Sequence, residues 1–99
     1  LILANLPYLT AAEMASLPPE VRDYEPLTAL SGGGDGLEVV RRLMGGFSDF
    51  LKPGGGLMLE VGPAQVAVVA QTLRWDHPEA RLEILTDLTG RKRVVRLEF

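Results

Sequence analysis

The sequence predicts an α/β fold whose sheet is mostly parallel, with one antiparallel strand at the C-terminal end. Three observations predict it. Residues 1–4 are uniformly apolar, which is typical of a strand buried on both faces of a parallel sheet. Apolar residues then recur at helical intervals over residues 35–51. Finally, residues 81–86 and 91–99 form two strand-like runs separated by a turn, which indicates a closing hairpin.

A short helix is expected to follow the first strand. Thr10 and Glu13 have the spacing of a capping box, in which each side chain accepts a hydrogen bond from the other residue's backbone N–H. Pro18 and Pro19 are expected to end this helix, because the residue before a proline avoids the helical conformation. We interpret residues 20–34 as an irregular loop that closes in a run of glycines.

The strongest helical pattern covers residues 35–51 and opens on a second capping-box spacing, between Asp35 and Glu38. Gly45 and Gly46 weaken its middle, by roughly 1 kcal/mol for each glycine. The glycine run before this helix does not follow the phosphate-binding pattern G-x-G-x-x-G, because Leu37 breaks the pattern and no strand directly precedes it. We therefore interpret the run as a loop and a helix cap.

The second half of the chain continues the alternation of strands and helices. Residues 56–61 form a second apolar strand, and Pro63 suits the first turn of a third helix. The apolar stripe of that helix consists of Val66, Val69, Ala70 and Leu73. Two strands, residues 81–86 and 91–99, then follow, joined by a turn at residues 87–90.

With 99 residues, the chain is expected to form a single domain. Its composition and charge exclude several classes of function. A formal net charge of −3 lacks the excess of Lys and Arg that a nucleic-acid-binding surface needs. The one basic cluster, residues 91–93, is interpreted as a solvated strand face. No stretch reaches the ~18 apolar residues of a membrane span, so no membrane partner is expected.

The chain has no cysteine and one histidine, so neither a disulfide nor a thiolate metal site can form. His77 has no second histidine with which to share a metal ion, and we interpret it as a loop residue; no metal site is expected. The absence of cysteine is compatible with a cytoplasmic location. Because the chain opens inside a hydrophobic run and without Met, we expect it to be the middle of a longer protein.

The tetrad Asn5-Leu6-Pro7-Tyr8 brings more chemistry to the end of the first strand than a turn needs. Functional groups gather at the carboxyl ends of strands in open α/β sheets. The side-chain oxygen of Asn5 and the carbonyl of Leu6 can each accept one N–H of a planar amino group. Pro7 keeps residue 6 extended, and Tyr8 can lie against the face of an amide or a base. The alternative is an ordinary X-Pro turn with Tyr8 in the core.

The tetrad and three further segments resemble, in order and spacing, the protein-(glutamine-N5) methyltransferases, the HemK-like family that methylates the glutamine of peptide-chain release factors. These segments are YEPLTALSGGGDGLEVVRRL, LKPGGGLMLEVGPAQ and DLTGRKRVVRLEF. The resemblance implies the C-terminal half of a Rossmann-like class I methyltransferase fold. Residues 1–99 would then be a partial, substrate-side domain of a cytoplasmic enzyme that uses S-adenosylmethionine.

The resemblance also assigns roles to the tetrad. Asn5 would be the catalytic residue and a cofactor contact, and Asn5, Leu6, Pro7 and Tyr8 would bind the glutamine substrate. The family's tetrad is usually Asn-Pro-Pro-Tyr, so Leu6 is a departure that loosens the preorganisation of its carbonyl. The family's glycine-rich cofactor loop and acidic ribose partner have no counterpart in residues 1–99. We therefore expect this chain alone to be inactive.

Three polar residues outside the tetrad have open interpretations. Glu25, by the resemblance, helps to shape the mouth of the substrate site; the alternative is an exposed loop carboxylate. Glu60 is unusual in an apolar strand, so it should either reach a polar rim or pair with an arginine such as Arg93. Gln65 is expected to cap a backbone or face a loop.

Two other functions stay open. The spelling Asn-Leu-Pro-Tyr also resembles the adenine dimethyltransferases of ribosomal RNA, so the chain could be a fragment of an rRNA or DNA adenine-N6 methyltransferase. It could also be a free-standing interaction module without activity. The Glu-Pro and Gly-Asp-Gly-Leu segments favour the glutamine enzymes, with a release factor as protein partner and no direct nucleic-acid partner. An exposed, uncharged edge on the first strand would in addition favour self-association.

Overall fold

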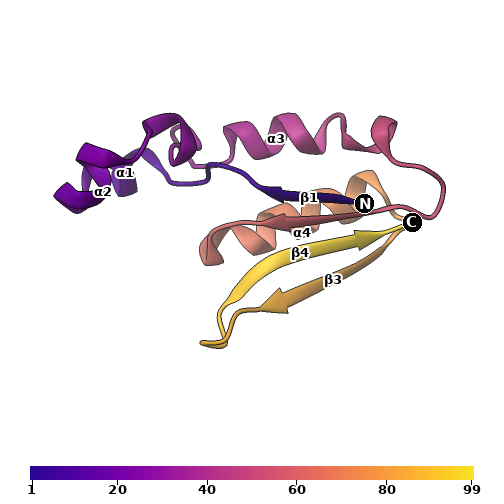
Figure 1. Ribbon diagram of the computed structural model, residues 1–99. Helices are drawn as coiled ribbons and strands as arrows, with labels where there is room; N and C mark the ends of the chain where they lie inside the picture. The colour runs from indigo at the N-terminus through magenta and orange to yellow at the C-terminus, as the bar shows by residue number, and fades with distance from the viewer. The chain divides into compact units, whose positions relative to one another are not determined.

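The helices and strands of the computed structural model, which describes residues 1–99, fall into two structural units (Figure 1). The first unit contains residues 1–5 and 46–99, and the second contains residues 6–45. The β-sheet belongs to the first unit. The second unit holds three α-helices and the glycine-rich loop.

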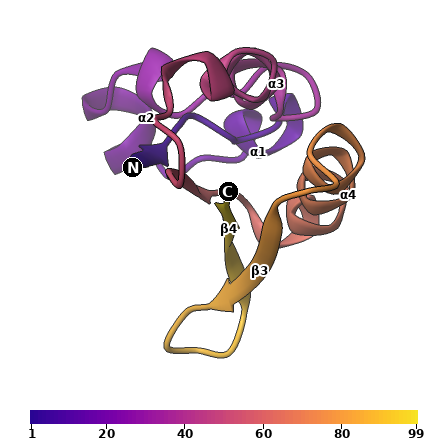
Figure 2. The same ribbon diagram turned by 90° about the vertical axis from the view of Figure 1, so that its right-hand side faces the viewer.

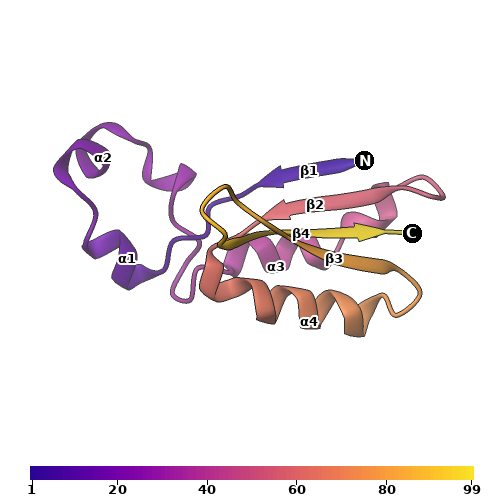
Figure 3. The same cartoon turned by 90° about the horizontal axis from the view of Figure 1, so that it is seen from below.

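The sheet of the first unit has four strands in the order β1-β2-β4-β3 (Figure 3). They are β1 (Ile2–Asn5), β2 (Gly56–Glu60), β3 (Arg81–Thr86) and β4 (Lys92–Glu98). β1 and β2 are parallel, whereas β4 pairs antiparallel with both β2 and β3. The α/β class is confirmed, but the expectation of a mostly parallel sheet is wrong, because two of the three pairings are antiparallel. The Rossmann-like topology stays an expectation.

The position of β4 explains this difference. β4 alone runs opposite to the other three strands, and because it lies between β2 and β3, both of its pairings are antiparallel. Local signals predicted the β3–β4 hairpin, whose turn contains Gly90 at φ +83° (Figure 2). They could not show that β4 also pairs with β2, because that partner lies far away along the chain.

One face of the sheet forms the core of this unit. Buried residues alternate along β2 and β4, and the register sets Leu57 opposite Leu97 and Leu59 opposite Val95. The helix α4 (Val66–Asp76) follows the short turn η3 (Pro63–Gln65) and contacts β3 and β4 (Figure 2). Its buried residues are Val66, Val69, Ala70 and Leu73. The stripe predicted for this helix is therefore confirmed.

The opposite face of the sheet carries Leu3, Met58 and Arg96, which the strand register sets side by side. Leu3 is 69% exposed, and burial alternates along β1. The expectation that the first strand is buried on both faces is therefore wrong for this structure. The physical reason is that α4, the long helix of this unit, packs against the other face, where Val95 and Leu97 are buried.

An aromatic corner closes one end of the first unit. Phe47, in the short turn η2 (Phe47–Phe50), is buried, with its ring centroid 5.1 Å from that of His77 and 6.3 Å from that of Phe99. The backbone N–H of His77 donates to the Leu73 carbonyl at 2.9 Å. His77 lies directly after α4, as its C-cap, so the interpretation of this histidine as a loop residue is confirmed, and its ring packs against the two phenylalanine rings. No group of three or more potential metal-ligating side chains occurs in the structure.

The second unit begins with the helix α1 (Ala11–Ala15) and its predicted cap. Thr10 Oγ1 accepts from the Glu13 N–H, and Glu13 Oε1 accepts from the Thr10 N–H, each at 3.1 Å. The capping box is confirmed. The irregular loop predicted over residues 20–34 is wrong in part, because α2 (Pro19–Tyr24) and the turn η1 (Leu27–Ala29) lie there. Pro19 begins α2 because proline suits the first turn of a helix, where its missing N–H costs nothing.

The long helix predicted over residues 35–51 is shorter in the structure. α3 (Glu38–Met44) ends at Gly45, and η2 is a separate turn. The two glycines break the pattern that apolar spacing alone predicted. The second capping box is also absent: Asp35 Oδ1 accepts from the Leu37 N–H at 3.0 Å, while the Glu38 N–H donates to the Gly32 carbonyl at 2.8 Å. None of the helices is long and apolar enough to cross a membrane.

Candidate functional site

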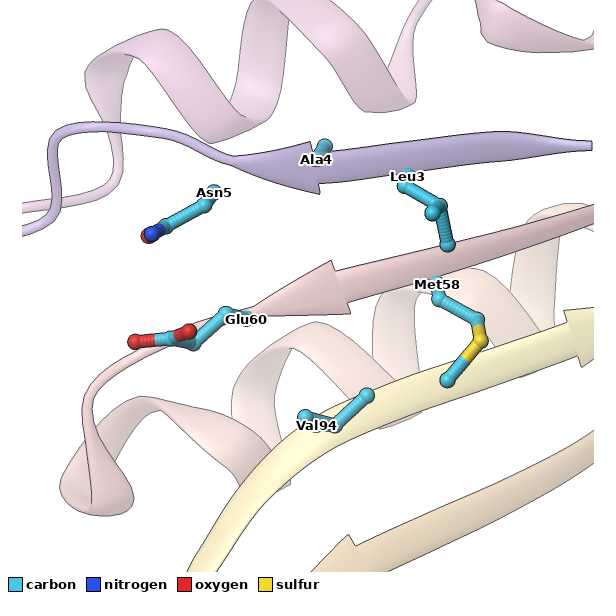
Figure 4. Close-up of a pocket in the computed structure, with 6 residues that line it drawn as sticks. All are labelled: Leu3, Ala4, Asn5, Met58, Glu60 and Val94. Atoms are coloured by element: carbon cyan, nitrogen blue, oxygen red, sulfur yellow. The ribbon is translucent and has the colours of Figure 1, made fainter.

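Asn5 is the last residue of β1, and Glu60 is the last residue of β2. The two strands are parallel, and the register pairs Asn5 with Glu60. Because side chains alternate along a strand, both lie on the face that carries Leu3 and Met58. Figure 4 shows both side chains extending toward the carboxyl ends of their strands. The structure thus sets a carboxamide beside a carboxylate at the carboxyl ends of two neighbouring strands.

Both side chains line an open hollow on this face of the sheet. Its volume is about 230 Å³, which is smaller than a typical pocket for a whole cofactor. The lining residues are Leu3, Ala4, Asn5, Met58, Glu60 and Val94 (Figure 4). Apart from Asn5 and Glu60, these side chains are apolar. The hollow therefore has an apolar floor and one polar end, and that end is formed by two neighbouring strand termini.

The sequence left two interpretations of Glu60 open and did not predict that it lies beside Asn5. Its position in an apolar strand suggested a polar rim or an arginine partner, and its place at the end of β2 agrees with the rim. Its register with Asn5 was not foreseen, because strand pairing is not a local signal. The guanidinium of Arg93 lies 3.3 Å from Asp87, measured from Nε to Oδ2, and both Glu60 and Arg93 make further interactions, so the arginine partner of Glu60 stays a prediction.

Leu6, Pro7 and Tyr8 begin the second unit, directly after Asn5, and each is half-buried. No peptide bond in the chain is cis, so the Leu6–Pro7 bond is trans. The proline disfavours the helical conformation at Leu6 and keeps it extended. The tetrad therefore joins the two units: its carboxamide belongs to the sheet, and its remaining three residues belong to the segment that follows.

The segment after the tetrad is held by main-chain hydrogen bonds. The Leu9 N–H donates to the Leu30 carbonyl at 3.0 Å, and the Leu9 carbonyl accepts from the Gly32 N–H at 2.9 Å. These bonds make a parallel bridge between Leu9 and Ser31. Sequence reasoning missed this anchor because it joins two segments that both look like loops. Glu25, considered for the substrate mouth, ends α2 and is exposed.

The glycine-rich loop closes on itself. A Cβ atom at Gly32 would clash with the Gly36 carbonyl oxygen, so the space beside this glycine is filled by the loop's own backbone. The Gly36 N–H donates to the Gly33 carbonyl at 3.2 Å. A cradle for a nucleotide-like cofactor would instead turn free N–H groups toward the ligand. These residues therefore do not fit the main binding loop of S-adenosylmethionine.

Three charged clusters have structural roles. Asp35 and Arg41 form an ion pair, and the Arg41 guanidinium lowers the pKa of the Asp35 carboxyl. In the β3–β4 turn, hydrogen bonds from the Thr89 hydroxyl and from the Arg91 and Thr89 N–H groups lower the pKa of Asp87 to about 2. Arg96 pairs with Glu83 and Glu98 on the strands. The basic segment of β4 is thus partly neutralised.

Gln65 is a buried polar residue with a clear local role. Its Oε1 accepts from the Gly62 N–H at 3.0 Å, across the start of η3. This backbone contact is the capping role expected from the sequence, and it stabilises the turn that leads from β2 into α4.

Comparison with curated proteins gives consistent names. The chain is 50% identical over 95 residues to a protein of Cereibacter sphaeroides named release factor glutamine methyltransferase, a match that covers 96% of this chain and 34% of that protein. Proteins of the same name from Gloeobacter violaceus and Deinococcus radiodurans are 44% and 45% identical, over 95% and 97% of this chain and 33% and 34% of their own length. The chain spans about one third of the length of these relatives. No protein-family model matches it.

Proposed function

We propose that the 99 residues of this chain form the substrate-side half of an enzyme. The chain belongs to the family of release factor glutamine methyltransferases, and the proposed enzyme is one of them. The enzyme transfers a methyl group from S-adenosylmethionine to the side-chain nitrogen (N5) of a glutamine in a peptide-chain release factor, and S-adenosylhomocysteine and one amide proton are released. The observation that carries the proposal is the similarity over nearly the whole chain to relatives that share this name. The position of Asn5 at the carboxyl end of β1 supports it.

The proposed chemistry is mainly positioning. An amide nitrogen is a weak nucleophile, so its lone pair must be aimed at the methyl group. The Oδ1 of Asn5 accepts one N–H of the substrate amide, and the Leu6 carbonyl accepts the other. Pro7 keeps that carbonyl from entering a helix, and the ring of Tyr8 forms a wall of the site. Holding the reacting nitrogen in one geometry removes much of the entropic barrier.

S-adenosylmethionine supplies the methyl group in this proposal. Within residues 1–99 we assign one contact to it, Asn5. The glycine-rich loop does not provide another, because Gly32 packs against the backbone of Gly36. We assign the remaining contacts to the part of the whole enzyme that lies outside residues 1–99, and we expect residues 1–99 alone to be inactive. We also propose a cytoplasmic location for the enzyme.

Asn5→Ala in the whole enzyme tests the proposal. Loss of the positioning oxygen should lower turnover by at least ~10²-fold. The measurement is mass spectrometry of the release-factor glutamine after incubation with enzyme and S-adenosylmethionine. Gln71→Ala removes an exposed carboxamide from α4 and serves as the matched control, with turnover unchanged. Methylation that survives Asn5→Ala would overturn the assignment.

The spelling Asn-Leu-Pro-Tyr favours one second candidate, an adenine-N6 methyltransferase acting on rRNA or DNA. The same enzyme preparation distinguishes the two with radiolabelled S-adenosylmethionine. We expect label in the release factor and none in ribosomal RNA or DNA. The opposite distribution would establish the nucleic-acid substrate, while leaving the positioning role of Asn5 intact.

A further inference from the structure

We propose that Glu60 is a positioning residue that fixes the orientation of the Asn5 carboxamide. The inference rests on the proposed function, because it concerns how Asn5 presents its oxygen to the substrate amide. It begins from placement. The register makes Asn5 and Glu60 direct neighbours on parallel strands, and their side chains point the same way from one face of the sheet (Figure 4). Neighbouring strands lie about 4.8 Å apart, so the two side chains can meet without movement of the backbone.

A carboxamide in this role needs such a neighbour. Its oxygen is an acceptor and its NH₂ group is a donor, but the two have nearly the same shape. Rotation about the last side-chain torsion, which is soft, exchanges them. If the NH₂ group of Asn5 faced the substrate amide, two donors would meet and the substrate nitrogen would not be held. The proposed reaction therefore requires one of the two orientations.

Glu60 distinguishes between these orientations. An ionised carboxylate only accepts hydrogen bonds, so it attracts the NH₂ group of Asn5 and turns Oδ1 away from itself, toward the substrate. The other residues that line the hollow, such as Met58 and Val94, have apolar side chains that do not compete for this NH₂ group. A hydrogen bond to a charged acceptor is also stronger than one between neutral groups. Glu60 thus acts on the reaction through Asn5 and does not touch the reacting atoms.

The test uses Glu60→Gln in the whole enzyme. Glutamine keeps the size of the side chain but carries both a donor and an acceptor, so it no longer selects one orientation of Asn5. We expect kcat to fall about 10-fold and the KM for release factor to change less than ~2-fold, because most contacts with a protein substrate lie elsewhere. The melting temperature should equal that of the wild type.

Glu83→Gln is the matched control. Glu83 is a half-buried carboxylate on β3, on the same face of the sheet, where it pairs with Arg96. Its replacement removes one negative charge from this face without touching the hollow, and kcat should not change. An equal fall in both variants would show that kcat responds to the charge of the face, and it would overturn the inference.

The decisive measurement is the effect of Glu60→Gln in the Asn5→Ala background, in single-turnover assays with enzyme in excess. If Glu60 acts only through Asn5, the second substitution should change the rate less than ~2-fold, although it costs about 10-fold alone. A 10-fold fall in both backgrounds would show that Glu60 acts independently, and the inference would fail. The proposed function itself would fail on a different result, namely full activity of Asn5→Ala.

Discussion

Leu6 is the residue at which this chain departs from the usual tetrad of its family. In the proposed site, only its main-chain carbonyl acts on the substrate. The side chain is half-buried, and the following proline already restricts the backbone. If the carbonyl alone matters, a residue that fixes φ more tightly should serve at least as well.

Leu6→Pro should therefore give turnover equal to or higher than that of the wild type. Proline locks φ near −65° and so reduces the freedom that the carbonyl must lose on binding substrate. The rate of release-factor methylation measures this, with melting temperature as the check on folding. A large loss of turnover in a folded variant would mean that the leucine side chain contributes to the site.

Ionisation of the Asp87 carboxyl makes the stability of the folded chain depend on pH. Its Oδ1 accepts from the Thr89 hydroxyl at 2.6 Å and from the Arg91 N–H at 3.0 Å, and its pKa falls to about 2. The unfolded chain has an Asp pKa near 3.9. Because the folded state holds the ionised form, this contribution is complete above about pH 4 and is lost as the pH falls toward 2.

Asp87→Asn should therefore be less stable than the wild type at pH 6, and the difference should shrink between pH 4 and pH 2. Urea unfolding at several pH values measures it. Asp49→Asn, which removes an exposed carboxylate outside the hairpin, corrects for the change in net charge. A constant difference across this range would show that the hydrogen bonds of the turn do not depend on ionisation of Asp87.

At the scale of elements, the glycine-rich loop holds the start of α3. The Gly32 carbonyl accepts a hydrogen bond from the Glu38 N–H. The Cα of Gly32 faces the backbone of Gly36, which leaves no room for a side chain. Gly34, two residues on, has no atom within 4 Å of the position that a Cβ would take. The two glycines thus offer a comparison in which the substitution is the same and the space is different.

Gly32→Ala should lower the free energy of unfolding by about 1–3 kcal/mol, the usual cost of overpacking a filled site. Gly34→Ala should change it by less than ~0.5 kcal/mol, as at an exposed position. Chemical denaturation of both variants provides the measurement. Equal effects would mean that the loop opens in solution and that the close approach at Gly32 does not contribute to stability.

Elements with local signals were predictable from the sequence. The capping box of Thr10 and Glu13, the buried stripe of α4 and the turn that contains Gly90 each depend on residues a few positions apart. Two errors were also local: Pro19 begins a helix where a loop was expected, and two glycines divide the segment 35–51. Proline was expected to end a helix here, although it also suits a first turn, and the apolar spacing of residues 35–51 continues across the glycines that end α3.

The candidate site also has features that local signals predicted and features that they could not predict. The position of Asn5 at the end of a strand followed from the apolar run before it. The pairing of Asn5 with Glu60 and the position of β4 could not be predicted, because strand register and order depend on contacts between distant segments. The anchor at Leu9 was missed for the same reason.

At the scale of the whole chain, β1 is an edge strand of the sheet of the first unit. It carries no charge, and Leu1 and Leu3 are 79% and 69% exposed. An uncharged apolar edge offers free main-chain groups to another strand. We therefore expect the 99-residue chain to self-associate, most simply as a dimer with two-fold symmetry.

Leu3→Lys should weaken this association, because a charge on an edge strand opposes pairing. Leu3 is exposed, so the variant should still fold, whereas a lysine at the half-buried Ile2 would also disturb the core. Light scattering over a range of concentrations gives the mass, and Val68→Lys on α4 is the control at an exposed apolar residue. A wild-type chain that stays monomeric at high concentration would contradict the expectation.

The central position of β4 has a consequence for how this chain is made. Synthesis proceeds from the N-terminus, so β1 and β2 can pair early, but β3 has no neighbour in the sheet except β4. Among these four strands, the one synthesised last is therefore the one that joins the others, and this pairing between distant segments is a slow kind of folding step. Until Lys92 to Glu98 emerge, β3 and one side of β2 stay unpaired and open to the wrong partners. A nascent chain that stalls just short of these residues would be a substrate for chaperones or for aggregation.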